Sequence, residues 1–121
     1  IRVSMALNGA GIHVPNVPNK TWTGADGKNY FRMSSDLFKF LFDTFGDPDI
    51  IKTKADGGIG GLNFPSQLIS IHNRGIYLME ADSYQVFGAE GHATLWAGLN
   101  CIGGHNYFGY AGNVFIWRLP Q

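Results

Sequence analysis

The residue of this sequence best suited to acid–base chemistry is His92. It follows Gly91 in the run Gly-His-Ala-Thr-Leu-Trp, and the alternation of a strand puts His92, Thr94 and Trp96 on one face. A histidine that shares a face with bulky side chains is partly desolvated, and histidine is the usual general base near neutral pH. By spacing alone, a structural histidine with satisfied hydrogen bonds explains the same pattern, so both interpretations stand at this stage.

The other nucleophilic and metal-binding candidates have weaker support. The single cysteine, Cys101, excludes a disulfide within the chain and leaves a buried thiol, a reactive thiol or a bridge to another chain. As a nucleophile, Cys101 would use His92 or His105 as base, but it follows a strand end, where nothing lowers its pKa. The remaining histidines have no paired spacing for zinc, so we expect no metal site. They are His13, His72 and His105.

Length and charge narrow the class of protein. The chain has 121 residues, 45% of them hydrophobic, and a formal net charge of zero, which indicates one globular domain. Lysine and arginine do not cluster, so a nucleic acid is not an expected partner. No apolar stretch approaches the ~20 residues that cross a bilayer, and no cleavable signal opens the chain, so we expect no membrane segment.

The first residues predict a helix. Residues 1–8 are typical of the interior of an amphipathic helix that ends at Gly9 or Gly11. Helical spacing puts Ile1 and Met5 on one side, with Ala6 and Leu7 nearby, and we expect this stripe to be buried in the core. The N-terminal turn of this helix is expected upstream of the first residue.

A second helix is predicted over residues 34–45. Ser34 or Ser35 supplies its N-terminal cap, and Gly46 followed by Pro48 ends it. Leucine and phenylalanine repeat along one side, which indicates a helix packed on a core rather than a cofactor site.

Two segments are rich in residues that form turns. Residues 12–29 predict a surface loop, in which Trp22 serves more readily as an anchor to the core than as a ligand platform. Residues 52–64 contain four glycines but no following Lys-Ser or Lys-Thr, so they predict a mobile loop rather than a phosphate-binding loop.

The second half of the chain predicts a small antiparallel sheet. Strand-forming residues occupy 69–71, 75–80, 91–98 and 113–119. Helices that come first and strands that come later indicate an α+β fold rather than a parallel sheet wound with helices.

Residues 91–96, followed by Gly98 and Cys101, resemble the histidine motif of the type VI secretion amidase effector 4 family, a branch of the papain-like NlpC/P60 superfamily. Other landmarks of the family occur in the same order, at residues 1–8, 24–28, 46–49 and 117–120. The resemblance covers nearly the whole chain. It implies an α+β, papain-like NlpC/P60 fold with N-terminal helices packed on a small antiparallel sheet. It also implies a single NlpC/P60-like amidase domain over residues 1–121, incomplete at its N-terminus.

The resemblance implies an active site as well. In the family, the nucleophilic cysteine opens a helix two residues before an Ile-Arg pair, so it is expected immediately upstream of Ile1, with His92 as general base. The acidic residue that orients the imidazole in the family falls at about Gly103, which has no carboxylate. The alternatives for this role are Asn100, His105 and Asn106. Cys101 matches a position that often pairs with a second cysteine, and because His105 occupies the partner's place, that bridge is expected to be lost.

The reaction that the resemblance implies is hydrolysis of the amide between D-glutamate and meso-diaminopimelate in the peptidoglycan stem peptide, without a cofactor. The chain would then be an antibacterial toxin, secreted or delivered to the periplasm of a target cell, with an immunity protein as partner. Residues 15–28 and 82–90 are the expected walls of its cleft, because function usually lies on loops held by a rigid scaffold.

An alternative function involves no catalysis. A papain-like domain without the nucleophile and the acidic residue would bind carbohydrate, peptidoglycan or protein. The tyrosines of the second half offer aromatic surface for such binding, although half-buried packing on strands explains them at least as well. They are Tyr77, Tyr84, Tyr107 and Tyr110. A cysteine ahead of Ile1 would decide in favour of the enzyme.

Overall fold

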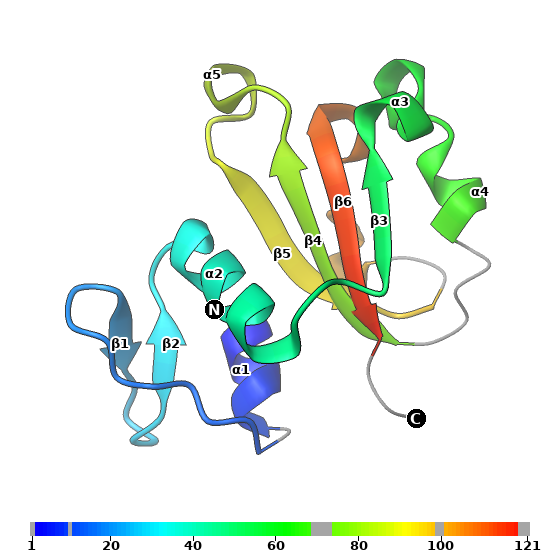
Figure 1. Cartoon of the computed structure of the whole chain (residues 1–121). Coiled ribbons are helices and arrows are strands. Elements are labelled where there is room, and N and C mark those ends of the chain that lie inside the picture. Colours follow the sequence, from blue (N-terminus) through cyan, green and yellow to red (C-terminus); the bar gives the residue numbers. More distant parts are fainter. Residues whose placement is uncertain (1, 10, 69–73, 99–100, 119–121) are drawn as a thin grey trace.

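The computed structural model describes residues 2–9, 11–68, 74–98 and 101–118. In this part of the chain, the first two long helices pack on one face of a four-stranded antiparallel sheet, and a two-stranded hairpin lies beyond them (Figure 1). The predicted α+β architecture is therefore confirmed. None of the helices in these ranges is long and apolar enough to cross a bilayer.

The first helix, α1 (Arg2–Gly9), ends where the sequence predicts. Gly11 has a φ of 80°, and its N–H donates to the carbonyl of Asn8 at 3.1 Å. The N–H of Ile12 donates to the carbonyl of Leu7 at 2.9 Å. These two bonds and the left-handed glycine form a Schellman motif, which satisfies carbonyls that a helix end leaves free.

The buried side of α1 differs from the prediction. Met5 is 57% exposed, so its predicted burial is wrong, whereas Leu7, which was expected near the same stripe, is buried, as is Val3. The other member of that predicted stripe, Ile1, lies outside the described residues. An eight-residue helix contains too few turns for its sequence to fix which side faces the core, so tertiary packing decides.

Helix α2 (Ser34–Phe45) matches the predicted range, and Leu41 is completely buried. The predicted serine cap is wrong, because the helix already includes both serines. Met33 precedes it in an extended conformation, and its side chain makes no capping bond. Gly46 ends the helix as predicted, with a φ of 73° and its N–H donating to the carbonyl of Phe42 at 2.9 Å.

Residues 12–29 do not form a simple loop. Strands β1 (Thr21–Thr23) and β2 (Asn29–Phe31) pair in an antiparallel hairpin. Trp22 is 56% exposed, and its ring lies 5.6 Å from the ring of Tyr30, directly across the hairpin. The predicted anchoring of this segment by a buried Trp22 is therefore wrong.

The main sheet has the strand order β3-β6-β4-β5, and every neighbouring pair is antiparallel. Its strands are β3 (Ile50–Thr53), β4 (Gly75–Ala81), β5 (Gly91–Trp96) and β6 (Ala111–Arg118). The last three confirm predicted strands, and β3 was not predicted. The strand predicted at residues 69–71 lies outside the described residues.

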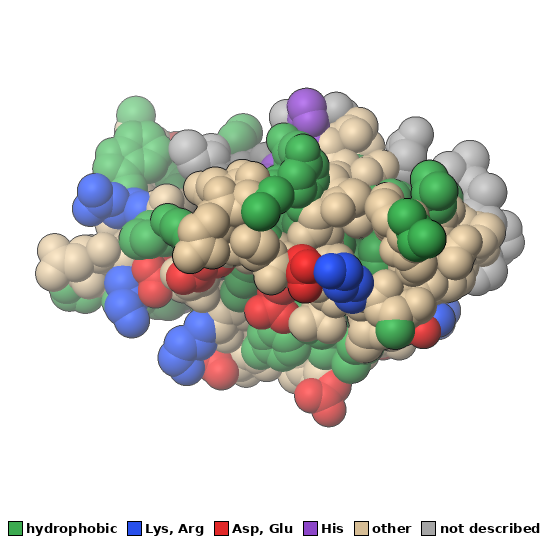
Figure 2. Space-filling view, turned by 90° about the horizontal axis from the view of Figure 1, so that it is seen from above, with side chains coloured by type: hydrophobic (Ala, Val, Ile, Leu, Met, Phe, Trp, Pro, Cys, Tyr) green, Lys and Arg blue, Asp and Glu red, His purple; other side chains and the backbone are tan. Residues whose placement is uncertain are grey.

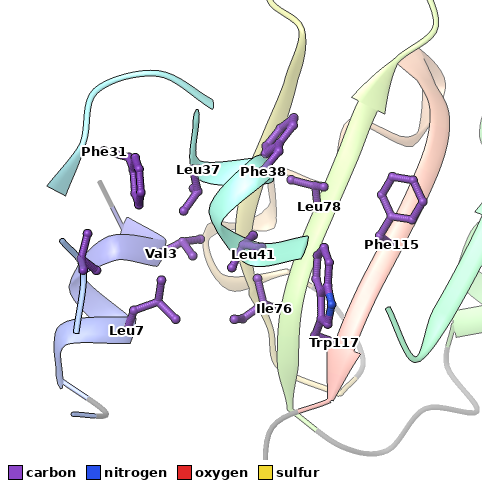
Figure 3. Packing of buried hydrophobic residues seen from close by; sticks show 11 residues of the cluster. Val3, Leu7, Phe31, Leu37, Phe38, Leu41, Ile76, Leu78, Phe115 and Trp117 are labelled. Atoms are coloured by element: carbon purple, nitrogen blue, oxygen red, sulfur yellow. The ribbon is translucent and has the colours of Figure 1, made fainter. Parts of the chain in front are cut away.

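Alternate residues of the sheet belong to two separate cores. The helix-covered face packs against α1 and α2 (Figure 3) and includes Ile76, Leu78, Ala93, Leu95, Phe115 and Trp117. The loop-covered face packs against α4 (Phe64–Leu68) and the turns around it, and includes Tyr77, Met79, Trp96, Val114 and Ile116. Cys101 and Phe108 pack on this second face.

The glycine-rich segment is packed rather than loose. It forms α3 (Lys54–Gly57) and the short 3-10 helix η1 (Ile59–Gly61). Gly61 lies so close to the 3-10 helix η3 (Phe108–Tyr110) that a Cβ there would collide with the carbonyl of Phe108. The predicted mobile loop is therefore wrong, because these glycines permit close approach of two backbones.

Candidate active site

His92 is the second residue of β5 and pairs with Met79 of β4, so its side chain lies on the loop-covered face, where it is partly buried. Gly91 points to the opposite face. A Cβ at Gly91 would collide with the carbonyl of Met79 and lie 3.0 Å from the ring of Phe38. Glycine before the histidine therefore lets β5 start in close contact with β4 and α2, which fixes the position of His92.

The rest of β5 closes the same face against solvent. Thr94 and Trp96 are buried beside His92, as the predicted alternation requires. The hydroxyl of Thr94 donates to the carbonyl of Ile102 at 3.4 Å and ties β5 to the 3-10 helix η2 (Ile102–Gly104). His92 therefore lies at the accessible end of a face that packing otherwise fills.

The imidazole of His92 lies against an aromatic cluster. The ring of Tyr107 meets it edge-to-face, with centroids 5.0 Å apart and an interplanar angle of 85°. The ring of His105 stacks on that of Tyr107, with centroids 5.6 Å apart and an interplanar angle of 20°. The ring of Phe87 meets Tyr107 edge-to-face, with centroids 5.0 Å apart. Figure 2 shows histidine side chains at the surface next to hydrophobic side chains. Sequence reasoning named Tyr107 only as one of several tyrosines, and no local signal marks its contact with His92.

The structure separates the alternatives for the orienting role. His105 is exposed and reaches the site through its stack on Tyr107. The side-chain oxygen of Asn106 accepts a hydrogen bond from the N–H of Phe108 at 3.1 Å, so it is used in fixing its own turn. Gly103 lies within η2, and Asn100 lies outside the described residues.

Cys101 is a buried thiol. It is 2% exposed, pairs with Trp96 in an isolated antiparallel bridge and packs in the core of the loop-covered face. Burial raises its pKa to about 12. Because the thiolate is the nucleophilic form of cysteine, this environment opposes catalysis by Cys101. The sequence left a buried thiol, a reactive thiol or a bridge to another chain as alternatives for Cys101, and the structure agrees with the buried thiol.

Helix α1 lies beside the strand that carries the histidine. It packs against β5, and in Figure 1 both run downward, so the N-terminal turn of α1 is its end nearer the start of β5. Ala93 and Leu95 of β5 face this helix, whereas His92 points to the other face. β5 is an edge strand of the four-stranded sheet, and at its far end Trp96 forms an isolated bridge with Cys101.

The predicted walls of the cleft line two different hollows. The segment 82–90, which includes the helix α5 (Tyr84–Phe87), lines one hollow together with Gly109 and Tyr110. Residues from 15–28 line another together with α2. Each of these two hollows is therefore lined by only one of the two predicted wall segments. Among the described residues, no group of three His, Cys, Asp or Glu side chains is placed to hold a metal ion.

A small antiparallel sheet covered by N-terminal helices, with a histidine opening an edge strand beside the first helix, defines a papain-like α+β domain. Residues 1–117 match the family described as type VI secretion system (T6SS), amidase effector protein 4. The chain belongs to this family, the peptidoglycan amidase effectors of the type VI secretion system, which are antibacterial toxins.

Solved structures agree with this assignment. The chain is similar to Tae4 in the effector–immunity complex Tae4–Tai4 from Salmonella Typhimurium, with 29% identity over 99% of this chain and 72% of that one, and a TM-score of 0.77. It is also similar to Tae4 in the Tae4–Tai4 complex from Enterobacter cloacae, with 28% identity, the same coverages and a TM-score of 0.72. No curated protein matches the chain.

Proposed function

We propose that this chain carries the general base of a cysteine–histidine amidase that cleaves the amide between D-glutamate and meso-diaminopimelate in peptidoglycan stem peptides. The observation that supports it most is the position of His92. Its imidazole is partly buried, contacts Tyr107 and lies at the start of an edge strand, beside the helix that the nucleophile would open. Membership in the amidase family supplies the reaction class.

The proposed nucleophile is a cysteine immediately upstream of Ile1. A cysteine at the N-terminus of α1 gains thiolate character from the helix dipole. Because His92 points away from the core side of α1, the thiol would meet the imidazole at the free edge of β5. This requirement makes the edge of β5, rather than either hollow described above, the proposed substrate cleft.

The reaction proceeds in two steps. His92 takes the thiol proton as the sulfur attacks the D-glutamyl carbonyl carbon, and backbone N–H groups at the helix start stabilise the oxyanion. The C–N bond then breaks, the imidazolium gives its proton to the amine of diaminopimelate, and an acyl-thioester remains. Water, deprotonated by His92, hydrolyses the thioester and restores the thiol. All groups required are side chains and backbone amides.

The proposed partner is an immunity protein. The similar Tae4 chains from Salmonella Typhimurium and Enterobacter cloacae were solved in complex with Tai4 immunity proteins. For this chain, an immunity protein of that kind would cover the edge of β5 and exclude the stem peptide. The place of action would be the periplasm of a target bacterium, where peptidoglycan lies.

A module that binds peptidoglycan without cleaving it is the second candidate, and one observation favours it. The family's acidic position falls at about Gly103, in the turn η2 beside β5, and glycine offers no group to orient the imidazole. If no other group does so, His92 would be a weak base and the domain would retain only its binding surface.

The test uses the intact natural protein, including the residues that precede Ile1, and a purified disaccharide-tetrapeptide that contains meso-diaminopimelate. We expect mass spectrometry to detect two products separated at the D-glutamyl amide, and no products after replacement of the upstream cysteine by alanine. Cleavage at another bond would refute the proposed specificity. Saturable binding to sacculi without new amines would refute the amidase and favour the binding module.

A further inference from the structure

The backbone of Tyr107 has a conformation that few bulky residues adopt. Its φ is 54° and its ψ is 34°, in the left-handed region that glycine and asparagine occupy most readily. Only Asn19 shares a positive φ among the non-glycine residues that the structure describes. Backbone strain of this kind persists where the surroundings enforce it, and such residues cluster at functional sites.

The surroundings of Tyr107 do enforce this conformation. On one side, the hydroxyl of the buried Tyr77 donates to the carbonyl of Asn106. On the other side, the N–H of Phe108 donates to the side-chain oxygen of Asn106. The ring of Phe108 packs against that of Phe64, with centroids 5.4 Å apart. The backbone is thus held by hydrogen bonds both before and after Tyr107.

The contacts of its ring explain why a tyrosine occupies this position. Glycine would relieve the strain, but it would leave three rings without a common neighbour. They are His92, His105 and Phe87, with ring centroids 5.0, 5.6 and 5.0 Å from that of Tyr107. The edge-to-face contact with His92 restricts rotation of the imidazole, because turning it would bring the two rings into collision. The strained backbone at Tyr107 therefore places an aromatic ring against the imidazole of His92.

We propose that Tyr107 is a positioning residue whose ring helps to hold the His92 imidazole in its working orientation. This inference rests on the proposed amidase function. It makes His105, which stacks on the ring of Tyr107, a support for this contact.

The test compares variants of the intact protein on the purified disaccharide-tetrapeptide. Tyr107→Gly relieves the backbone but removes the ring and its packing, so we expect a thermal midpoint near that of wild type but a kcat reduced roughly 10- to 100-fold, with little change in KM. Tyr107→Asn, which also tolerates the left-handed region, should behave alike. Tyr107→Phe keeps the ring and should retain most activity. Tyr110→Ala is the matched control, because Tyr110 contacts Phe87 and is exposed.

A second readout does not depend on activity. The ring of Tyr107 shifts the imidazole C–H resonances of His92 in the NMR spectrum, and we expect Tyr107→Gly but not Tyr107→Phe to move them. Unchanged His92 resonances and unchanged kcat in Tyr107→Gly would overturn the inference. If the wild-type protein cleaves nothing while the resonances move as expected, the proposed amidase fails and the packing of Tyr107 on His92 stands.

Discussion

The two faces of the main sheet differ in chemistry although the same strands build them. The helix-covered face buries side chains such as Leu41, Leu78 and Trp117 against α1 and α2. The loop-covered face combines apolar packing with the hydroxyl of Tyr77, the thiol of Cys101 and the imidazole of His92. The loop-covered face thus combines the proposed general base, His92, with buried polar groups such as the Cys101 thiol that serve packing.

This difference follows from what covers each face. A helix presents only side chains to a sheet, because its backbone groups bond to one another. Turns present free carbonyl and N–H groups, and these bind polar side chains of the sheet, as the carbonyls of Ile102 and Asn106 bind Thr94 and Tyr77. The turns therefore satisfy these two hydroxyls, although the indole Nε1 of Trp96, a described residue on the same face, is buried without a hydrogen-bond partner.

The largest expected effect on stability lies on the helix-covered face. Leu41 is completely buried between α2 and the sheet, so Leu41→Ala should lower the free energy of unfolding by about 2–5 kcal/mol. Urea denaturation measures this change. The matched control is Met5→Ala on the exposed side of α1, which should alter stability by less than about 0.5 kcal/mol. Equal effects would contradict the assignment of the core.

A smaller effect should come from a polar group of the loop-covered face. Tyr77→Phe removes the donor to the buried carbonyl of Asn106, so it should cost about 1–3 kcal/mol. Tyr30→Phe removes a hydroxyl that donates to the exposed carboxylate of Asp26, and it should cost clearly less. If Tyr77→Phe unfolds at the same urea concentration as wild type and Tyr30→Phe, the hydrogen bond from Tyr77 to Asn106 does not contribute to stability, which contradicts the prediction.

The next effect depends on pH. Burial raises the pKa of Cys101 to about 12, against about 8.5 in an unfolded chain. The folded state keeps a proton that the unfolded chain releases, so the contribution of Cys101 to stability should be constant below about pH 8 and should fall as the pH rises toward 12. The urea midpoint should thus be lower at pH 9.5 than at pH 7, and Cys101→Ala should reduce the difference. An equal fall in both proteins would assign it to other groups.

The smallest effect is expected at the surface. Lys39 and Asp43 form an ion pair of 2.8 Å on the exposed side of α2. The pair raises the pKa of Lys39, but both groups stay hydrated and screened by salt. Lys39→Ala should therefore leave the urea midpoint within experimental error of wild type. A clear loss of stability would mean that this side of α2 contributes more than its exposure indicates.

Local patterns predicted much of the fold. The α2 range and the strands β4, β5 and β6 follow from periodicity over enough residues to define it, and the same alternation placed His92 beside Thr94 and Trp96. The family resemblance is confirmed over residues 1–117. This resemblance predicted a papain-like fold, whereas composition predicted only a globular domain.

The remaining features depend on contacts between distant residues. Strand β3 has only four residues and is defined by its pairing with β6, about sixty residues away in sequence. Gly61 is packed closely against the backbone of Phe108, and Tyr107 contacts His92 only because the turn that carries it folds over the sheet. No window of sequence contains both partners of such a contact, so these features had to come from the structure.

The most direct test of the central claim is the kcat/KM of the intact protein on the stem-peptide substrate, compared between His92→Ala and His105→Ala. Both imidazoles lie next to Tyr107, but only His92 opens β5 beside α1. We predict that His92→Ala lowers kcat/KM by roughly 10²–10⁴-fold, the usual contribution of a general base, and that His105→Ala lowers it by far less. Equal losses, or a fully active His92→Ala, would contradict the assignment of His92 as the base.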